Sequence, residues 1–113
     1  MTLRTVTLRR SEDRDGTRYL GASMVGEGDI RIDGQDLGPG VTAWFGEGIT
    51  EYEWTWTIRA AAIPRLLTAL GEPADADPLA ALARRFSGDR AADLKSFLDD
   101  NEIEHDAWSR VGD

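Results

Sequence analysis

Two glutamates in one short stretch are the first candidates for chemistry. Glu51 and Glu53 lie two positions apart in the segment 51–58, EYEWTWTI. In an extended strand, alternate side chains leave the same face about 7 Å apart. A pair of carboxylates can act as acid and base in catalysis, or bind a divalent cation. It can also form a solvated or protein-binding face, which is the interpretation that we favour.

Further acidic residues and a tryptophan lie close to this pair in the sequence. A tryptophan beside carboxylates suits an arginine-bearing partner through cation–π and ion-pair contacts. We therefore predict a partner-binding surface with Trp44 as its aromatic anchor. Its residues are Asp29, Asp33, Asp36, Trp44, Glu47, Glu51 and Glu53.

Other reactive residue types are scarce. The single histidine, His105, lies in an acidic tail, and the sequence has no Gly-x-Ser-x-Gly nucleophile motif. Cysteine is absent, which excludes thiolate zinc sites and cysteine nucleophiles. Arg31 occupies the middle ligand position of a calcium loop, and the glycines of 34–40 lack the lysine of a phosphate-binding loop. We predict no catalytic residue, no metal site and no cofactor.

The charge of the chain limits its partners. A net charge of −8 over 113 residues argues against nucleic acid and is compatible with a basic protein partner. General solubility is the simpler interpretation of the same charge. No apolar run approaches the roughly 18 residues of a membrane span, and MTLRTVTLRR lacks the apolar region of a signal peptide. We therefore expect no membrane partner and a cytoplasmic location.

The first half of the chain must supply the sheet that positions these residues. Strands are expected over 2–10, 17–25 and 29–33, and the polar turn 11–16 ends in Asp-Gly, a common hairpin signal. The segment 50–58 is the clearest strand because polar and apolar residues alternate along it. Tyr52, Trp54, Trp56 and Ile58 would face the core and Glu51, Glu53, Thr55 and Thr57 would face away from it.

A short helix is expected over 37–45, between the third and fourth strands. Asp36 is placed to cap its start, and Gly46 follows its end. This helix would present three apolar side chains inward, those of Val41, Trp44 and Phe45.

The second half changes to the spacing of helices. Leucines at helical intervals predict one helix over 63–70 and another over 78–86, the latter with Asp77 as its N-cap. Asp89 can cap a third helix that ends near Asn101. The tail 102–111 is either a last strand or an ordered extended segment.

Four short motifs carry a resemblance. They are Gly34-Gln35-Asp36-Leu37-Gly38, Trp44-Phe45-Gly46, Glu51-Tyr52-Glu53-Trp54 and the segment from Phe97-Leu98 to Ile103. With them the chain resembles, over about 30–111, a group of small, mostly uncharacterised bacterial proteins. The shared motifs are structural, so the resemblance implies a fold and no catalytic residue. By analogy, small acidic proteins of this size often serve as immunity partners of toxins, which suggests a basic toxin or nuclease as partner.

Together these features predict a single α+β domain over 1–113. It should contain an antiparallel sheet of four to five strands with about three helices packed on one face. The favoured function is that of a non-enzymatic interaction protein. The alternative is a small enzyme or ligand-binding domain that uses Glu51 and Glu53 in a cleft beside Trp44. An exposed sheet face or edge would also permit a homodimer.

Overall fold

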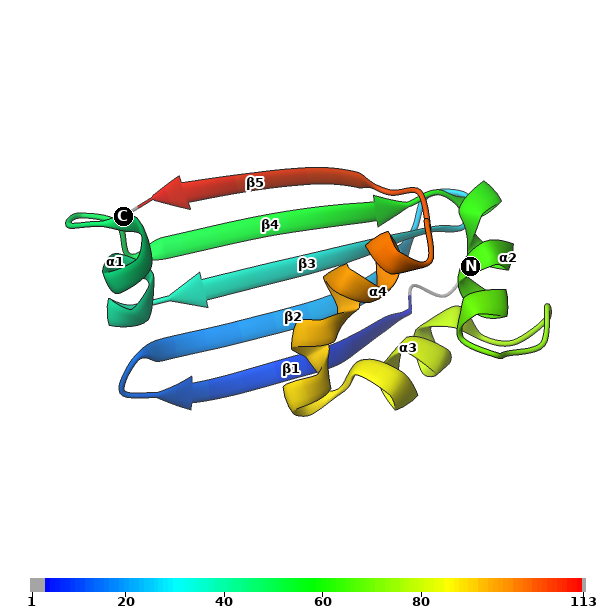
Figure 1. The fold of residues 1–113 in the computed structure, drawn as a ribbon, viewed down its shortest axis with the longest axis horizontal. Helices are drawn as coiled ribbons and strands as arrows, with labels where there is room; N and C mark the ends of the chain where they lie inside the picture. Colours follow the sequence, from blue (N-terminus) through cyan, green and yellow to red (C-terminus); the bar gives the residue numbers. More distant parts are fainter. Residues whose placement is uncertain (1–3, 113) are drawn as a thin grey trace.

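A five-stranded antiparallel sheet forms the centre of the molecule in a computed structural model that describes residues 4–112 (Figure 1). The strands lie side by side in chain order, so each one pairs with its neighbour in the sequence. Their bounds are β1 (Thr5–Asp13), β2 (Gly16–Val25), β3 (Asp29–Leu37), β4 (Glu51–Ile58) and β5 (Asp106–Gly112). The predicted α+β class is confirmed, and the tail after 105 is a strand.

Two strands are longer than their local sequence indicates. β1 continues to Asp13, opposite Gly16, so the expected turn shrinks to Arg14 and Asp15. The start of the predicted first strand, residues 2–3, lies outside the described residues. β3 continues beyond 33 to Leu37 because β2 and β4 pair with it along its whole length. Pairing on both sides satisfies backbone groups that would otherwise favour a turn.

The helices also follow the predicted pattern, with differences at the points where they begin. Their bounds are α1 (Pro39–Phe45), η1 (Ala60–Ala62), α2 (Ile63–Ala69), α3 (Pro78–Phe86), η2 (Gly88–Asp93) and α4 (Leu94–Asp100). Asp77 caps α3 as predicted, since its side chain accepts from the backbone N–H groups of Leu79 and Ala80. Asp89 does not begin an α-helix, because η2 is a 3₁₀ segment and α4 starts only at Leu94.

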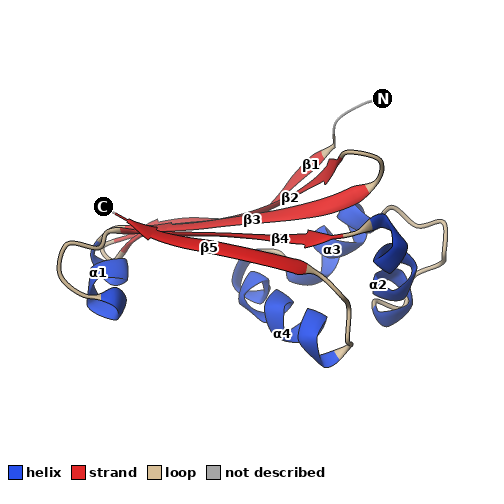
Figure 2. Ribbon diagram, turned by 90° about the horizontal axis from the view of Figure 1, so that it is seen from above, coloured by secondary structure: helices blue, strands red, loops and turns tan. Residues whose placement is uncertain are grey.

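All four α-helices lie on one side of the sheet, in two separate groups (Figure 2). α2, α3 and α4 cover one end, and α1 stands alone at the other end. The core lies under the larger group, where strand isoleucines meet helix leucines. Its fully buried large side chains are Ile30, Ile32, Ile58, Leu66, Leu79, Leu82, Leu94, Leu98 and Ile103. On this side of the sheet, the area between the two helical groups is not covered by a helix.

The opposite face of the sheet carries mainly polar residues and no helix of residues 4–112 packs on it (Figure 2). Such one-sided burial is typical of antiparallel sheets. None of the described helices is long and apolar enough to cross a membrane.

Candidate functional site

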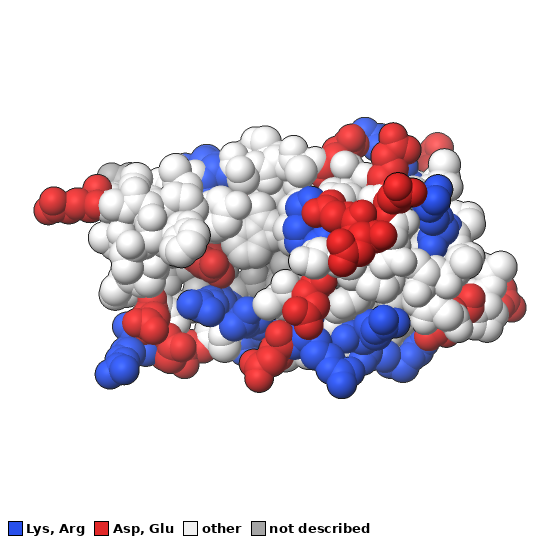
Figure 3. All heavy atoms as spheres, in the orientation of Figure 1, with Lys and Arg blue, Asp and Glu red and all other residues white. Residues whose placement is uncertain are grey.

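A groove crosses the helix side of the sheet between α1 and η2. It consists of two adjoining cavities of about 320 and 290 Å³, which share Arg18, Asp36 and Tyr52 in their walls. Trp44 and Phe45 line it at the α1 end, and Ala91 and Ala92 line it at the η2 end. Figure 3 shows this hollow between the two helical groups. We call it the aromatic groove.

A row of aromatic rings runs along the groove. The ring centroids of Phe45 and Tyr52 are 5.1 Å apart, those of Tyr52 and Trp54 are 5.0 Å apart and stacked, and those of Trp54 and Trp56 are 6.3 Å apart. Trp54 and Trp56 were expected in the core, but both remain partly exposed. They pack against the core on one side and line the groove on the other, because the larger helical group does not extend over them completely.

The helix α1 is held at the end of the sheet by hydrogen bonds to backbone carbonyl groups. Gly40 donates its N–H to the carbonyl of Asp15 at 2.7 Å, and the Thr42 hydroxyl donates to the carbonyl of Ile49 at 2.6 Å. The helix begins after Gly38, whose φ of 110° is a conformation that favours glycine. The prediction that Asp36 caps this helix is therefore wrong, since Asp36 is a residue of β3 paired between Arg18 and Tyr52.

Only one of the three apolar side chains expected to face inward from α1 is buried. Val41 is buried, whereas Trp44 is 84% exposed and Phe45 is 41% exposed. A helix of about two turns presents a narrow stripe to the sheet, and Val41 fills that stripe. The large indole of Trp44 is left at the rim of the groove, where it is free to contact another molecule.

Several charged residues line the groove without direct partners, among them Arg9, Arg18 and Asp36. No ion pair or side-chain hydrogen bond joins Arg9, Arg18 or Asp36 to another residue of the part that the structure describes. Burial raises the pKa of Asp36 above its ordinary value, and the positive charges of Arg18 and Arg9 oppose this shift. A half-buried carboxylate without a hydrogen-bond donor is costly, which is typical of binding sites.

The sequence interpretation did not include Arg9 and Arg18 in the site. The sequence did indicate the position of Arg18, because this residue points to the same face of β2 as the buried residues Leu20 and Ala22. A charged residue on the apolar face of a strand marks a place where the core ends. Arg9 gives no such signal, because a shift of register between Thr7 and Arg9 changes the parity of β1.

One polar atom in the groove wall has no partner of its own. The indole nitrogen of Trp54 is buried, and no described residue accepts a hydrogen bond from it. Buried donors in folded proteins are nearly always paired, so this N–H group, which lies against Gly34, is a feature that needs an explanation.

The predicted acidic pair lies on the other face of the sheet. Gln35 Nε2 donates to Glu51 at 3.2 Å and to Glu53 at 3.4 Å, and Arg110 Nη2 lies 3.6 and 3.7 Å from the same two carboxylates. A side-chain hydrogen bond with Glu51 lowers the pKa of Glu53, and Arg110 and Gln35 lower it further, against a smaller effect of burial. Neither glutamate lines the aromatic groove. The structure therefore does not place them in a cleft beside Trp44.

Two further predicted residues also have partners within the chain. Asp33 accepts hydrogen bonds from Arg31 Nε and from the Thr55 hydroxyl, each at 2.9 Å. Asp29 accepts from the backbone N–H of Ala60 at 2.8 Å.

The seven predicted contact residues therefore separate into three places. The sheet face opposite the helices carries Asp29, Asp33, Glu51 and Glu53. The groove is lined by Asp36 and Trp44, and Glu47 is exposed in the loop after α1. Within residues 4–112, no group of three or more His, Asp and Glu side chains is placed to hold a metal ion.

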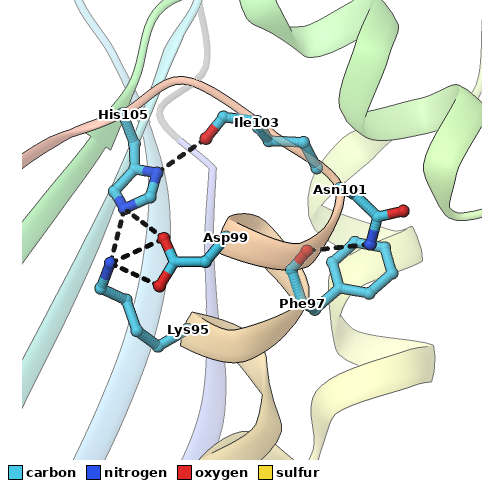
Figure 4. Close-up of polar contacts among 6 residues, drawn as sticks. All are labelled: Lys95, Phe97, Asp99, Asn101, Ile103 and His105. Atoms are coloured by element: carbon cyan, nitrogen blue, oxygen red, sulfur yellow. Dashed lines mark hydrogen bonds and ion pairs between the residues drawn. The ribbon is translucent and has the colours of Figure 1, made fainter.

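The single histidine belongs to a network of polar contacts that joins two elements of the fold (Figure 4). His105 Nδ1 lies 2.8 Å from the carbonyl oxygen of Ile103, which can only accept, so Nδ1 carries the proton. Nε2 lies 3.1 Å from Lys95 Nζ, which also contacts the Asp99 carboxylate at 3.0 and 3.1 Å. With Nδ1 directed to Ile103, Nε2 accepts from Lys95, and this network fastens the start of β5 to α4.

The chain matches no protein-family model, no curated protein and no solved structure.

Proposed function

We propose that this chain is a non-enzymatic interaction protein that holds a protein partner in the aromatic groove. The observation that carries the proposal is the 84% exposure of Trp44 at the groove rim. Tryptophan is enriched among the few residues that dominate binding energies, because its large ring removes much apolar surface from water. Trp44 is accordingly the proposed anchor.

The groove beside the anchor supplies the rest of the contact surface. Rings of Phe45, Tyr52, Trp54 and Trp56 form one continuous apolar row from α1 to the larger helical group. Such rigid rings lose little conformational entropy when a partner covers them. The unpartnered charges of Arg9, Arg18 and Asp36 provide polar contacts along the same groove. An apolar centre with polar groups around it is the usual anatomy of an interface.

The charge of the whole chain favours a basic partner. At −8 it would attract a positively charged protein over distances of about one Debye length, roughly 8–10 Å, and so increase the association rate. On the sheet face opposite the helices, by contrast, Arg31 and Arg110 neutralise part of the acidic charge. In this proposal the aromatic rings of the groove make the contact, and the net charge of the whole chain acts on the encounter.

A photo-crosslinking experiment tests the proposal. A photoreactive amino acid replaces Trp44 in the source cells, and in a matched control it replaces Trp108, which is 54% exposed on the opposite face. We expect position 44, and not position 108, to give an adduct with a protein other than a second copy of this chain. With the purified partner, Trp44→Ala should weaken binding at least about tenfold, and Trp108→Ala should change it less than about twofold. Equal adducts from both positions, or unchanged affinity of Trp44→Ala, would contradict the proposal.

A small-molecule ligand is the second candidate, and two observations favour it. The two cavities have volumes near the lower end of the range for ligand pockets, about 300–1,000 Å³. Asp36 lines both cavities and has no ion pair or side-chain hydrogen bond among the described residues, so its carboxylate is free to accept from a ligand. Native mass spectrometry of the protein purified from its source should then show a bound mass that Asp36→Ala loses. A wild-type protein without any added mass would count against this candidate.

A further inference from the structure

The strand β5 forms an open edge of the sheet. It pairs with β4 on one side, and among residues 4–112 no strand pairs with its other side. Residues 106–111 are all exposed, and Figure 1 shows no helix beyond this strand. A free edge presents unpaired backbone N–H and C=O groups, which another strand can satisfy.

The opposite edge, β1, is protected in ways that β5 is not. β1 contains a register shift between Thr7 and Arg9, and α3 and η2 pack against it. Bulges and helical cover are common devices that prevent pairing of edge strands. β5 has neither, since its register with β4 runs without interruption from Asp106 to Gly112.

The charged side chains of β5 are held by its own chain. Asp106 lies 2.8 Å from Arg59 Nη2, and Arg110 lies beside Glu51 and Glu53. Charges that project from an edge strand into solvent hinder its pairing with a second strand. Here these charges already form ion pairs within the chain. Two large apolar side chains of β5 are exposed instead, Trp108 at 54% and Val111 at 43%.

The sequence of β5 is complementary to itself in one register. Two antiparallel copies centred on Ser109 pair all seven residues of the strand, from Asp106 opposite Gly112 to Gly112 opposite Asp106. Trp108 then faces Arg110 of the second copy, and Ala107 faces Val111. Cation–π and apolar pairs of this kind stabilise adjacent strands. A register centred on Arg110 would oppose two arginines, and one centred on Trp108 would pair only five residues of the strand.

We propose that the chain forms a two-fold homodimer in which β5 pairs antiparallel with β5 of a second copy, centred on Ser109. The two sheets then join into one sheet of ten strands, with the helices of both copies on the same side. Closed two-fold symmetry satisfies both free edges at once and leaves no β5 edge for further growth. No residue that lines the aromatic groove belongs to β5, so this proposal stands independently of the proposed function.

Light scattering coupled to size-exclusion chromatography provides the first test. At about 100 µM, where a weak dimer would be populated, the wild type should have twice the mass of the 12.4 kDa chain. Ala107→Lys with Val111→Lys places lysines opposite one another and should give monomers. Ala107→Lys with Val111→Glu places opposite charges in the same positions and should restore the dimer. The control, Thr5→Lys with Thr7→Lys on β1, should remain dimeric.

A single-cysteine experiment tests the register. The chain has no cysteine, so Ser109→Cys introduces a single thiol. Opposite Cα atoms in an antiparallel pair are about 4.5–5.5 Å apart, within the range for a disulfide. Mild oxidation should therefore link Ser109→Cys into a covalent dimer, while Ser11→Cys on β1 should form no covalent link. A monomeric wild type at all concentrations, a dimer that persists in the double lysine variant, or linkage through Ser11→Cys would each overturn the proposal.

Discussion

The indole ring of Trp54 lies directly over Gly34, the residue opposite it on β3. A Cβ atom at position 34 would come within 2.0 Å of Trp54 Cε2 and 2.1 Å of Cζ2. The backbone of Gly34 is part of a regular strand and does not have the positive φ of several other glycines of this chain. Gly34 is therefore required here for room, because the ring that lines the groove occupies the space of a side chain.

Gly34→Ala should displace the Trp54 ring and destabilise the fold. We expect a loss of about 1–3 kcal/mol in the free energy of unfolding, as for other substitutions that overpack a tight contact. Urea denaturation measures the loss. A shift in tryptophan fluorescence should accompany it, because the ring moves toward solvent.

A double-mutant cycle shows whether the ring is the cause. In a Trp54→Ala background, Gly34→Ala should cost almost nothing, or stabilise by about 0.4–1 kcal/mol through a less flexible unfolded chain. The same cost in both backgrounds would show that the contact between the ring and the glycine is not responsible.

Neutralising Asp36 should stabilise the protein at neutral pH. Burial raises the pKa of this carboxyl, so the folded state binds its proton more tightly than the unfolded state does. Stability should then fall as pH rises from about 3.9, the ordinary value for aspartate, through the raised pKa. Asp36→Asn removes this penalty. Urea midpoints measured across pH should show its advantage over the wild type growing through this window and then reaching a plateau.

Asp33→Asn is the matched control for this prediction. Asp33 lies on the opposite face and accepts hydrogen bonds from Arg31 and Thr55, so its neutralisation should not increase stability at neutral pH. If Asp36→Asn has the same advantage at pH 3 as at pH 7, the ionisation of Asp36 is not the origin of the effect.

Removing the N-cap of α3 should weaken the larger helical group. The Asp77 carboxylate accepts from the backbone N–H groups of Leu79 and Ala80, and it also pairs with Arg4. Asp77→Ala should lower the free energy of unfolding by about 1 kcal/mol, the usual value of a cap. Asp77→Asn keeps the cap but loses the ion pair, so in urea denaturation it should remain close to the wild type. Equal losses in both variants would assign the effect to the ion pair instead.

Local patterns predicted the regular elements well. The alternation in 51–58 places Tyr52, Trp54 and Trp56 on the helix side and Glu51 and Glu53 on the other, as expected. Leucine spacing and the Asp77–Pro78 pair predicted α2 and α3. These features depend on the period of a strand or helix and on hydrogen bonds between neighbours in the chain, so nearby residues are sufficient to specify them.

The site could not be predicted in the same way. Asp36 has the local context of a helix cap, but pairing with β2 and β4 extends β3 through it and turns its side chain into the groove. Arg9 and Arg18 reach the same groove only because β1 and β2 lie beside β3. No spacing along the chain relates these three residues.

By itself, the sequence determined the strands, the helices and the face to which most side chains point, because these follow from periodicity and capping. The tertiary structure decided how far the helices extend over the sheet. Since the larger group stops short of α1, the rings of Trp54 and Trp56 line a groove in place of a closed core, and Trp44 remains at its rim. How much of the sheet the helices cover depends on contacts between segments that are distant in the chain, and local patterns do not specify those contacts.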